Sequence, residues 1–211
     1  MHILNLLFAI SLFASCGSSH SQNTASKQKA NLEHLDIAYF GSGCFWCVEA
    51  IYESVEGVTE VINGYAGGHK VNPTYREVGS GRTGHAEVIA VYYDADIISF
   101  KTLTDIYYAS QDPTTIGQSP DFGDAYRSII FYDNEVEKSI AETAKKQLGE
   151  SKMYSKPIVT EILPFKVFYP AEDYHQDYER LNPNQPYVRS VSIPRLNRFK
   201  AKHPELLKKE Q

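Results

Sequence analysis

Two cysteines three residues apart are the side chains in this 211-residue chain best suited to do chemistry. Cys44 and Cys47 follow Gly41-Ser42-Gly43, where a short apolar segment ends and a helical pattern begins. Unpaired N–H groups and the helix dipole stabilise a thiolate at a helix N-terminus, which lowers the pKa of a cysteine there. The position therefore predicts that Cys44 is a nucleophile. The alternative is a buried cysteine that packs as a small hydrophobic residue.

Glu87 is the second candidate for chemistry. It lies within residues 84–93, the clearest strand pattern in the chain, and shares a strand face with Ile89 and Val91. A carboxyl on the inward face keeps its proton because desolvation raises its pKa, and it can then act as a general acid at neutral pH. The alternative is an exposed glutamate on an edge strand, and periodicity alone does not decide between the two.

Two elements are expected to position Cys44. Residues 35–40 have the length and apolar character of a buried strand, and residues 48–55 carry apolar side chains at helical spacing before Gly57. Strands mixed with helices around one core predict an α/β fold, a two-layer sandwich with helices against a mainly antiparallel or mixed sheet. The remaining strands are predicted at residues 58–63, 84–93, 127–132 and 159–163, and the remaining helices after Ser99, at residues 134–148 and at residues 172–180.

Composition narrows the function classes. The net charge is −5 with acids and bases mixed along the chain, so no basic stripe for nucleic acid is present. Three cysteines are too few for a disulfide-stapled scaffold, and one Cys-x-x-Cys supplies half a zinc site. Neither a metal nor a dinucleotide cofactor is expected, and the length favours one folded domain. Thiol redox chemistry is the class that remains.

The N-terminal residues resemble an export signal. Residues 3–14 are apolar but too short to span a membrane, and the small residues before Cys16 resemble a bacterial lipobox. We therefore predict a signal peptide at residues 1–16, lipidation of Cys16 and a flexible tether at residues 17–34. This would make the protein a lipoprotein of the bacterial cell envelope facing the periplasm. Phe13 in place of the usual Leu, and an n-region without Lys or Arg, leave simple secretion with a free Cys16 as the alternative.

Six short motifs occur in order along the chain: Gly43-Cys44-Phe45-Trp46, Asn72-Pro73-Thr74-Tyr75, Gly84-His85-Ala86-Glu87, Asp112-Pro113-Thr114, Tyr126-Arg127-Ser128 and Tyr174-His175-Gln176. Together they resemble peptide methionine sulfoxide reductase of the A type, from about Ile37 to Tyr187. The resemblance implies a ferredoxin-like core and a catalytic domain at residues 35–188. Residues 189–211 are then expected to be an extended tail that finishes in a short exposed helix.

The resemblance also implies a role for each polar residue of a site that reduces methionine-S-sulfoxide, free or protein-bound. Cys44 matches the nucleophile that attacks the sulfoxide sulfur, and Glu87 matches the acid that protonates the departing oxygen. Tyr75 and Tyr126 match two hydroxyls that hold this oxygen, while Asp121 aligns with an acidic residue lining the pocket. The chemistry needs such donors because thiolate attack builds negative charge on oxygen.

Phe45 and Trp46 match the aromatic wall around the sulfoxide methyl group in the same family. An apolar slot beside the nucleophile suits a methyl group and can discriminate between sulfur epimers. The alternative for both residues, and for Tyr75 and Tyr126, is plain core packing.

Recycling of the oxidised nucleophile is the point where the chain departs from many family members. These use a cysteine near the C-terminus, after the position of Tyr187-Val188, and that cysteine is missing here. We therefore hypothesise that Cys44 and Cys47 form an internal disulfide, which a thioredoxin-like dithiol partner reduces. Direct reduction of Cys44 by an external dithiol, with Cys47 only packing, is the alternative. The protein is expected to be a monomer that meets the membrane only through its lipid anchor.

Two other functions compete with this interpretation. A thioredoxin-like thiol-disulfide oxidoreductase also uses Cys-x-x-Cys at a helix start, but it would have no use for Glu87 and the two tyrosines. A non-catalytic surface lipoprotein would use its cysteines only for cross-links.

Overall fold

The computed structural model of the protein describes residues 32–209. The predicted signal peptide, Cys16 and residues 17–31 of the predicted tether lie outside the described residues. Within residues 32–209, no helix is long and apolar enough to cross a membrane.

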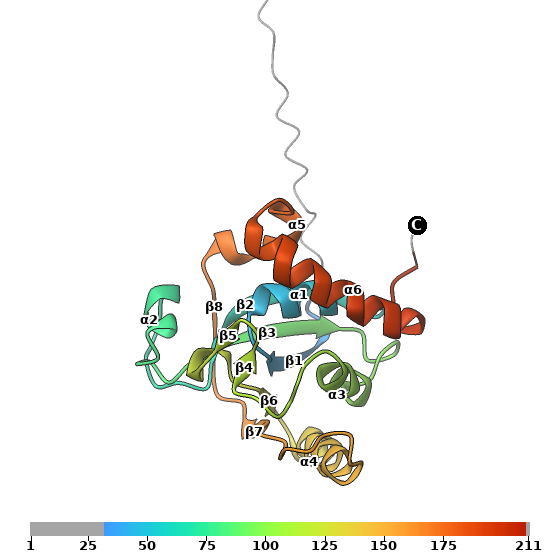
Figure 1. Cartoon of the computed structure of the whole chain (residues 1–211). Helices are drawn as coiled ribbons and strands as arrows, with labels where there is room; N and C mark the ends of the chain where they lie inside the picture. The colour runs from blue at the N-terminus through green and yellow to red at the C-terminus, as the bar shows by residue number, and fades with distance from the viewer. Residues whose placement is uncertain (1–31, 210–211) are drawn as a thin grey trace, which may run out of the picture.

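A six-stranded sheet forms the centre of the molecule, in the order β7-β6-β1-β3-β2-β8 (Figure 1). All neighbouring strands are antiparallel except β6 and β7, which are parallel. The units β1-α1-β2 and β3-α3-β6 interleave as two split βαβ units, so the predicted α/β fold with a ferredoxin-like core and a mixed sheet is confirmed. The strands are β1 (Asp36–Gly41), β2 (Val58–Ala66), β3 (Ala86–Tyr93), β6 (Ile129–Tyr132), β7 (Glu161–Pro164) and β8 (Phe168–Pro170).

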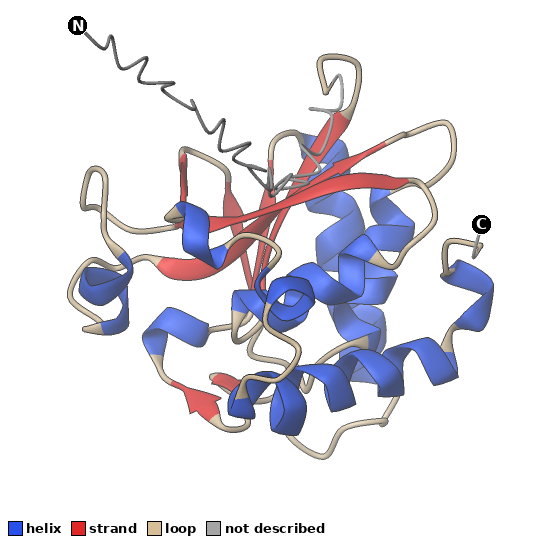
Figure 2. Ribbon diagram, turned by 90° about the horizontal axis from the view of Figure 1, so that it is seen from above, coloured by secondary structure: helices blue, strands red, loops and turns tan. Residues whose placement is uncertain are grey.

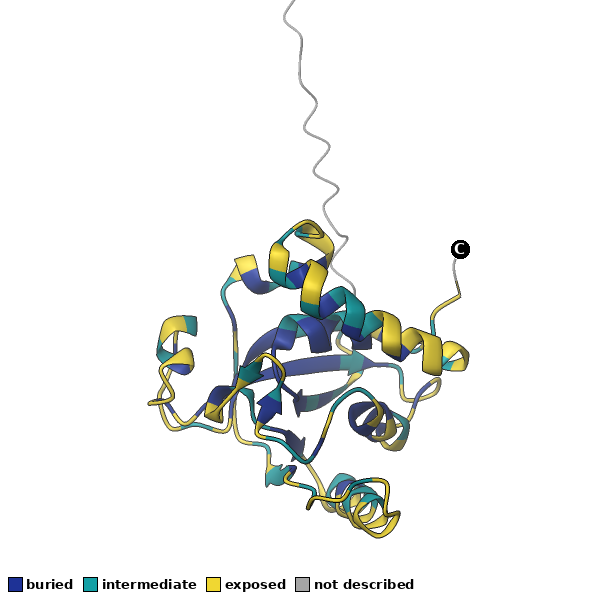
Figure 3. Ribbon diagram, in the orientation of Figure 1, coloured by how far each residue is buried: buried dark blue, intermediate teal, exposed yellow. Residues whose placement is uncertain are grey.

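Helices gather on one side of this sheet (Figure 2). The main hydrophobic core lies there and includes Phe40, Ile51, Ile89 and Leu103, all fully buried. Burying a side chain of this size stabilises the fold by about 1.5–3 kcal/mol. The inner helix and strands are dark in Figure 3, whereas the outer faces of the peripheral helices are exposed. The helices are α1 (Phe45–Glu53), α2 (Tyr75–Gly79), α3 (Phe100–Ala109), α4 (Glu135–Glu150), α5 (Tyr178–Leu181) and α6 (Ile193–Lys202).

A second, smaller cluster covers the opposite face. Strand alternation sends Ala38 and Phe40 into the main core and Tyr39 to the other side. There the Tyr39 ring stacks on Phe165, with ring centroids 3.9 Å apart, and also contacts Phe168. The chain between β7 and β8 therefore takes the place of a helix layer on this face.

Helix caps follow from the sequence. The Ser99 side chain accepts a hydrogen bond from the Thr102 N–H at 3.1 Å and so caps α3, as predicted. Asn134 caps α4 through bonds of 3.0 Å from two backbone N–H groups. The helix predicted at residues 172–180 is wrong. It splits into a 3-10 turn, η2 (Asp173–His175), and α5, because Gln176 is extended and Asp177 takes a left-handed φ of 54°.

The prediction of an extended C-terminal tail is also wrong. After a π-helical turn, η3 (Val188–Ser192), α6 crosses over α1 (Figure 1), and Phe199 is buried. Lys208 N–H then donates to Ser54 O at 2.9 Å, and Leu207 bridges to Val55. The many basic residues of α6 hid its apolar stripe from the sequence analysis. Short elements complete the fold, namely β4 (Gly117–Gln118), β5 (Asp121–Phe122), η1 (Asp124–Tyr126) and η4 (Pro204–Leu206).

Candidate active site

Cys44 is the N-cap residue of α1, where the sequence predicted it, and its side chain is 7% exposed. The preceding Gly43 has φ +76°, a conformation that favours glycine. A Cβ added there would lie 2.9 Å from Gln118 Cγ, so a side chain at this position is also crowded. Gly43 N–H donates to Tyr126 O at 3.1 Å, which ties the turn before Cys44 to η1.

Glu87 lies beside this turn although it is 43 positions from Cys44 in the chain. It sits on the central strand β3, is 3% exposed, and its Oε2 accepts the Phe45 N–H at 2.9 Å. The alternative of an exposed edge-strand glutamate is therefore wrong. Burial raises the pKa of Glu87 to about 8, with the charge of Asp121 adding to the rise and the Phe45 N–H opposing it. At neutral pH this carboxyl holds a proton.

The two thiols affect each other's pKa, and burial of Cys44 opposes the lowering of its pKa that the helix start predicted. Burial raises the pKa of Cys44 well above its ordinary value, and the hydrogen bond to Cys47 raises it further. The same hydrogen bond lowers the pKa of Cys47, against the effect of burial. The helix N-terminus does not offset this rise in the pKa of Cys44. The first N–H of α1 donates to Glu87, and the Cys44 side chain accepts no capping hydrogen bond.

Tyr187 is a site residue that the sequence analysis used only as the end of the resemblance. Its hydroxyl lies 3.7 Å from Cys47 Sγ and donates a short hydrogen bond to Asp121 Oδ2. The hairpin of β4 and β5 carries Asp121 into this position. The Tyr187 phenol thus contacts both Asp121 and Cys47. In the sequence, the position of Tyr187 in the family resemblance was the only signal for this residue.

Tyr75 and Tyr126 reach the site from two different elements. Tyr75 begins α2, and its N–H donates to Glu172 Oε1 at 3.0 Å; Tyr126 ends η1. Burial, followed by the charge of Glu87, raises the pKa of both phenols. Both therefore remain protonated donors.

The aromatic pair after Cys44 lies against these phenols. The Phe45 ring stacks with Tyr75 at 6.2 Å between centroids and lies 6.2 Å from Trp46. The Trp46 indole stacks on Tyr178 at 3.8 Å, and its N–H donates to His175 Nδ1 at 3.1 Å. The structure thus brings all the predicted catalytic and wall residues together around Cys44.

A buried guanidinium is hydrogen-bonded to the backbone of the turn that precedes Cys44. Arg195, on α6, donates from its guanidinium to Ser42 O at 3.1 Å, to Ser42 Oγ at 3.0 Å and to Ser110 O at 3.1 Å. Its charge also helps to lower the pKa of Cys47. Sequence analysis missed this residue because it assigned α6 to an extended tail.

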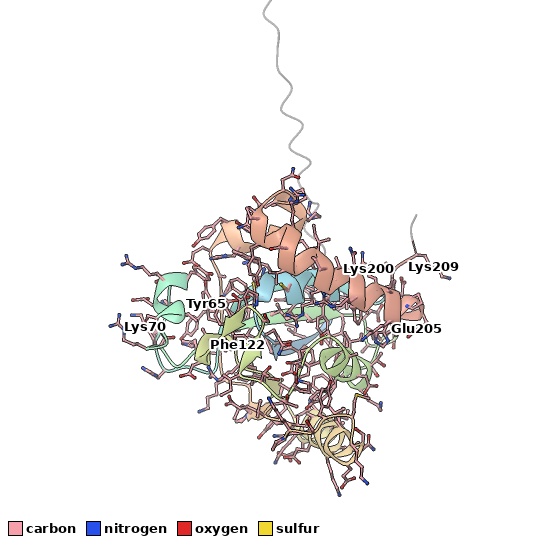
Figure 4. The ribbon with its side chains drawn as sticks, viewed as in Figure 1. Tyr65, Lys70, Phe122, Lys200, Glu205 and Lys209 are labelled. Carbon is pink, nitrogen blue, oxygen red and sulfur yellow. The ribbon has the colours of Figure 1, made fainter. Side chains whose placement is uncertain are left out.

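The site lies at the α2 end of the molecule. Across residues 32–209, no group of three or more His, Cys, Asp or Glu side chains is arranged to hold a metal ion. The outer end of α6 and the segment after it point away from α2. Figure 4 labels Tyr65 and Phe122 on the α2 side and Lys200, Glu205 and Lys209 on the other.

Fold and site together define an α/β oxidoreductase whose reaction passes through a cysteine thiol. A family model described as peptide methionine sulfoxide reductase matches residues 36–207. The chain belongs to the peptide methionine sulfoxide reductase family, and within it to the A type.

Similar proteins agree with this membership. A relative from Polynucleobacter asymbioticus named peptide methionine sulfoxide reductase MsrA is 42% identical over 178 residues, which cover 84% of this chain and 94% of that protein. An MsrA from Picrophilus torridus is 47% identical over 168 residues, 79% of this chain and 94% of that one. The solved methionine sulfoxide reductase A of Corynebacterium diphtheriae has a TM-score of 0.63 at 34% identity, covering 73% of this chain and 81% of its own.

Proposed function

We propose that the protein reduces methionine-S-sulfoxide, free or in oxidised proteins, to methionine. The relatives carry the name of this activity, and the geometry around Cys44 suits it. The observation that carries the proposal is Glu87, a buried carboxyl that keeps its proton and is hydrogen-bonded to the residue directly after Cys44. A thiol-disulfide exchange enzyme needs no such acid, so the thioredoxin-like alternative is not favoured.

The first step transfers oxygen from the substrate to Cys44. The Cys44 sulfur attacks the sulfoxide sulfur, and the negative charge that develops on oxygen is met by the phenols of Tyr75 and Tyr126 and by a proton from Glu87. The protonated oxygen then passes to the Cys44 sulfur as the bond between the two sulfurs and the S–O bond of the substrate break, which leaves methionine and a sulfenic acid on Cys44. The acceptor we propose for the proton that Cys44 must lose is the Cys47 sulfur, whose pKa is lowered to about 6 by the interaction with Cys44.

The second step forms a disulfide between Cys44 and Cys47. The Cys47 sulfur attacks the sulfenic sulfur, and the hydroxyl group of the sulfenic acid leaves with a proton as water. Support comes from the mutual effect of the two thiols on their pKa values and from the absence of a cysteine after Tyr187 in the sequence. A thioredoxin-like dithiol then reduces the disulfide. A Cys47→Ser variant should keep the first oxygen transfer and lose recycling by thioredoxin; undiminished recycling would favour direct reduction of Cys44.

An assay on a peptide that contains methionine sulfoxide tests the main proposal. Incubation of the protein with each sulfur epimer and dithiothreitol should remove one oxygen mass from the S epimer only, and Cys44→Ser should abolish the loss. Reduction of an insulin disulfide without any mass loss on either epimer would overturn the proposal in favour of the thioredoxin-like alternative.

We further propose that the protein is an exported monomer anchored in the bacterial cell envelope by a lipid on Cys16 and facing the periplasm. The support is the apolar segment at residues 3–14 and the small residues that precede Cys16. Cells fed a labelled fatty acid should label the wild-type chain in the membrane fraction, whereas Cys16→Ala should be unlabelled. Light scattering of the folded domain would test whether it is a monomer.

A further inference from the structure

The Tyr174-His175-Gln176 motif has no role in the steps above, yet His175 lies in the middle of the aromatic wall. The His175 side chain is 1% exposed. Its ring centroid is 4.3 Å from that of Tyr75, 5.1 Å from that of Phe45 and 5.6 Å from that of Trp46. His175 therefore contacts both proposed wall residues and one of the two phenols.

The hydrogen bond from Trp46 fixes the protonation state of His175. An indole N–H can only donate, and it donates to His175 Nδ1 at 3.1 Å. Nδ1 must then carry a lone pair, so the proton of the neutral ring is on Nε2. Nε2 is buried and has no hydrogen-bond partner within the described residues. A second proton on the ring would have to go to Nδ1, which would remove the acceptor that Trp46 uses.

The backbone around His175 is held in place by side chains of other elements. Asn63 Nδ2, on β2, donates to His175 O at 2.8 Å, and the Asn63 N–H donates to Gln176 Oε1 at 2.8 Å. Asp177 N–H donates to the buried Glu49 Oε1, on α1, at 2.7 Å. These three hydrogen bonds restrain residues 175–177, so the segment that carries the imidazole is held independently of the indole.

One charged group faces the imidazole closely. Glu172 Oε2 is 4.0 Å from His175 Nε2, and the Glu172 carboxylate also accepts from the Tyr65 hydroxyl and the Tyr75 N–H. Its charge favours a protonated imidazole, but burial of the ring is the larger effect, and the pKa of His175 is below its ordinary value. The other titratable groups that contact the ring or the indole are phenols: Tyr174 on the same turn η2, Tyr75 on α2, Tyr178 on α5, and Tyr187 before η3.

We propose that neutral His175 is a positioning residue that holds the Trp46 indole as the wall of the sulfoxide methyl pocket, and that protonation of His175 releases this wall. This role of His175 rests on the proposed function. His175 does not touch the reacting atoms and acts only by orienting Trp46. Acidic solution would then weaken substrate binding through Trp46, independently of the thiols and Glu87.

The chain contains a single tryptophan, so one indole N–H signal reports on Trp46 alone. In the reduced protein, the nitrogen–proton NMR signal of this indole should move and lose its protection from solvent exchange as the pH falls from about 8 to about 4.5. His175→Asn provides the matched variant, because its side-chain oxygen can accept from the indole but does not titrate. Glu172→Gln separates the titration of the nearby carboxylate from that of the imidazole.

Two NMR results would overturn the proposal. One is an indole signal that does not change in the wild type over this range, and the other is the same titration in the wild type and in His175→Asn. Neither measurement uses substrate. An inactive protein with a titrating indole would contradict the proposed function alone, whereas an active protein with an unresponsive indole would contradict the role of His175 alone.

Kinetics test the consequence for the substrate. Removing the acceptor in His175→Phe should raise KM for the sulfoxide peptide about tenfold and leave kcat within about threefold, because a pocket wall binds ground state and transition state alike. His175→Asn should restore KM at neutral pH. Circular dichroism of each variant checks the fold; an unchanged KM in a folded His175→Phe would also overturn the proposal.

Discussion

Glu87 and Cys44 show how a residue's chemistry depends on where the fold puts it. An acid buried on a central strand keeps its proton, while the thiol at the helix start competes with Glu87, which accepts the first N–H of α1. The proposed general acid is therefore ready at neutral pH, and the nucleophile has to be deprotonated during the reaction.

The titration of Glu87 predicts the alkaline limit of activity. Single-turnover oxygen transfer should fall about tenfold per pH unit above about pH 8, as the acid loses its proton. Glu87→Gln should lower the rate about 10²–10⁴-fold at neutral pH and remove that limit. Rapid-quench measurement of methionine formed across the pH range checks both, and an alkaline limit that persists in Glu87→Gln would assign it to another group.

The same shift predicts a change in stability. Since the folded pKa of about 8 exceeds the ordinary 4.5, the folded state binds the Glu87 proton more tightly than the unfolded state does. Its contribution to the free energy of unfolding is fully present below about pH 4.5 and is lost as the pH rises through about 8. Urea titrations of wild type and Glu87→Gln at several pH values should therefore diverge across this window, with the wild type losing stability relative to the variant as the pH rises.

Tyr187 is expected to act on the second step and not on the first. Its hydroxyl contacts Cys47 and Asp121, whereas the residues proposed to hold the sulfoxide oxygen are Tyr75 and Tyr126. Tyr187→Phe should slow formation of the Cys44–Cys47 disulfide about tenfold, because it removes the hydroxyl that connects Asp121 to Cys47, and a hydrogen bond to a charged group is worth about 1.5 kcal/mol. Oxygen transfer should change by less than about threefold. Thiol titration after a single turnover measures the first rate; a slower oxygen transfer in Tyr126→Phe serves as the contrast.

Helix α6 acts as an element that supports the catalytic turn. It lies across α1 and sends Arg195 to the backbone of Ser42, two residues before Cys44. Arg195 is buried, whereas Arg198 and Lys200 on the same helix are exposed. The turn that presents the nucleophile is thus held by an element from the far end of the chain.

Arg195→Met should lower the free energy of unfolding by about 1–3 kcal/mol, because Ser42 O and Ser110 O lose their donor in a buried place. Arg198→Met makes the same change on an exposed position of the same helix and should cost less than about 0.5 kcal/mol. Urea denaturation of the two variants gives the comparison. Equal losses would mean that Arg195 does not support the turn.

At the scale of the whole molecule, the folded unit extends past the boundary expected at residue 188. Phe199 is buried in the main core, and the chain after α6 returns to pair with the end of α1 at Val55. The domain is therefore one body in which the last described residues close over the helix that follows the nucleophile.

A chain ended at residue 188 should be less stable than one ended at Lys209 by about 3–5 kcal/mol or more, the cost of removing a large buried side chain such as Phe199. Thermal unfolding of the two chains by circular dichroism measures this. Equal melting temperatures would show that α6 is dispensable to the fold.

The sequence by itself determined the local features of this protein. Turn glycines, the Ser99 cap, strand alternation around Glu87 and the register of the motifs depend on neighbours within a few residues, so they could be predicted from residue types and spacing. The two-layer α/β arrangement followed from the order of these elements.

Only the tertiary structure decided the properties that depend on burial and on contacts distant in sequence. The raised pKa of Cys44 comes mainly from burial by the whole fold. Three contacts join residues from separate elements: Tyr187 with Cys47, Arg195 with Ser42, and Trp46 with His175. The removal of water and the pairing of charges are set by the packed chain as a whole, and no local pattern encodes them.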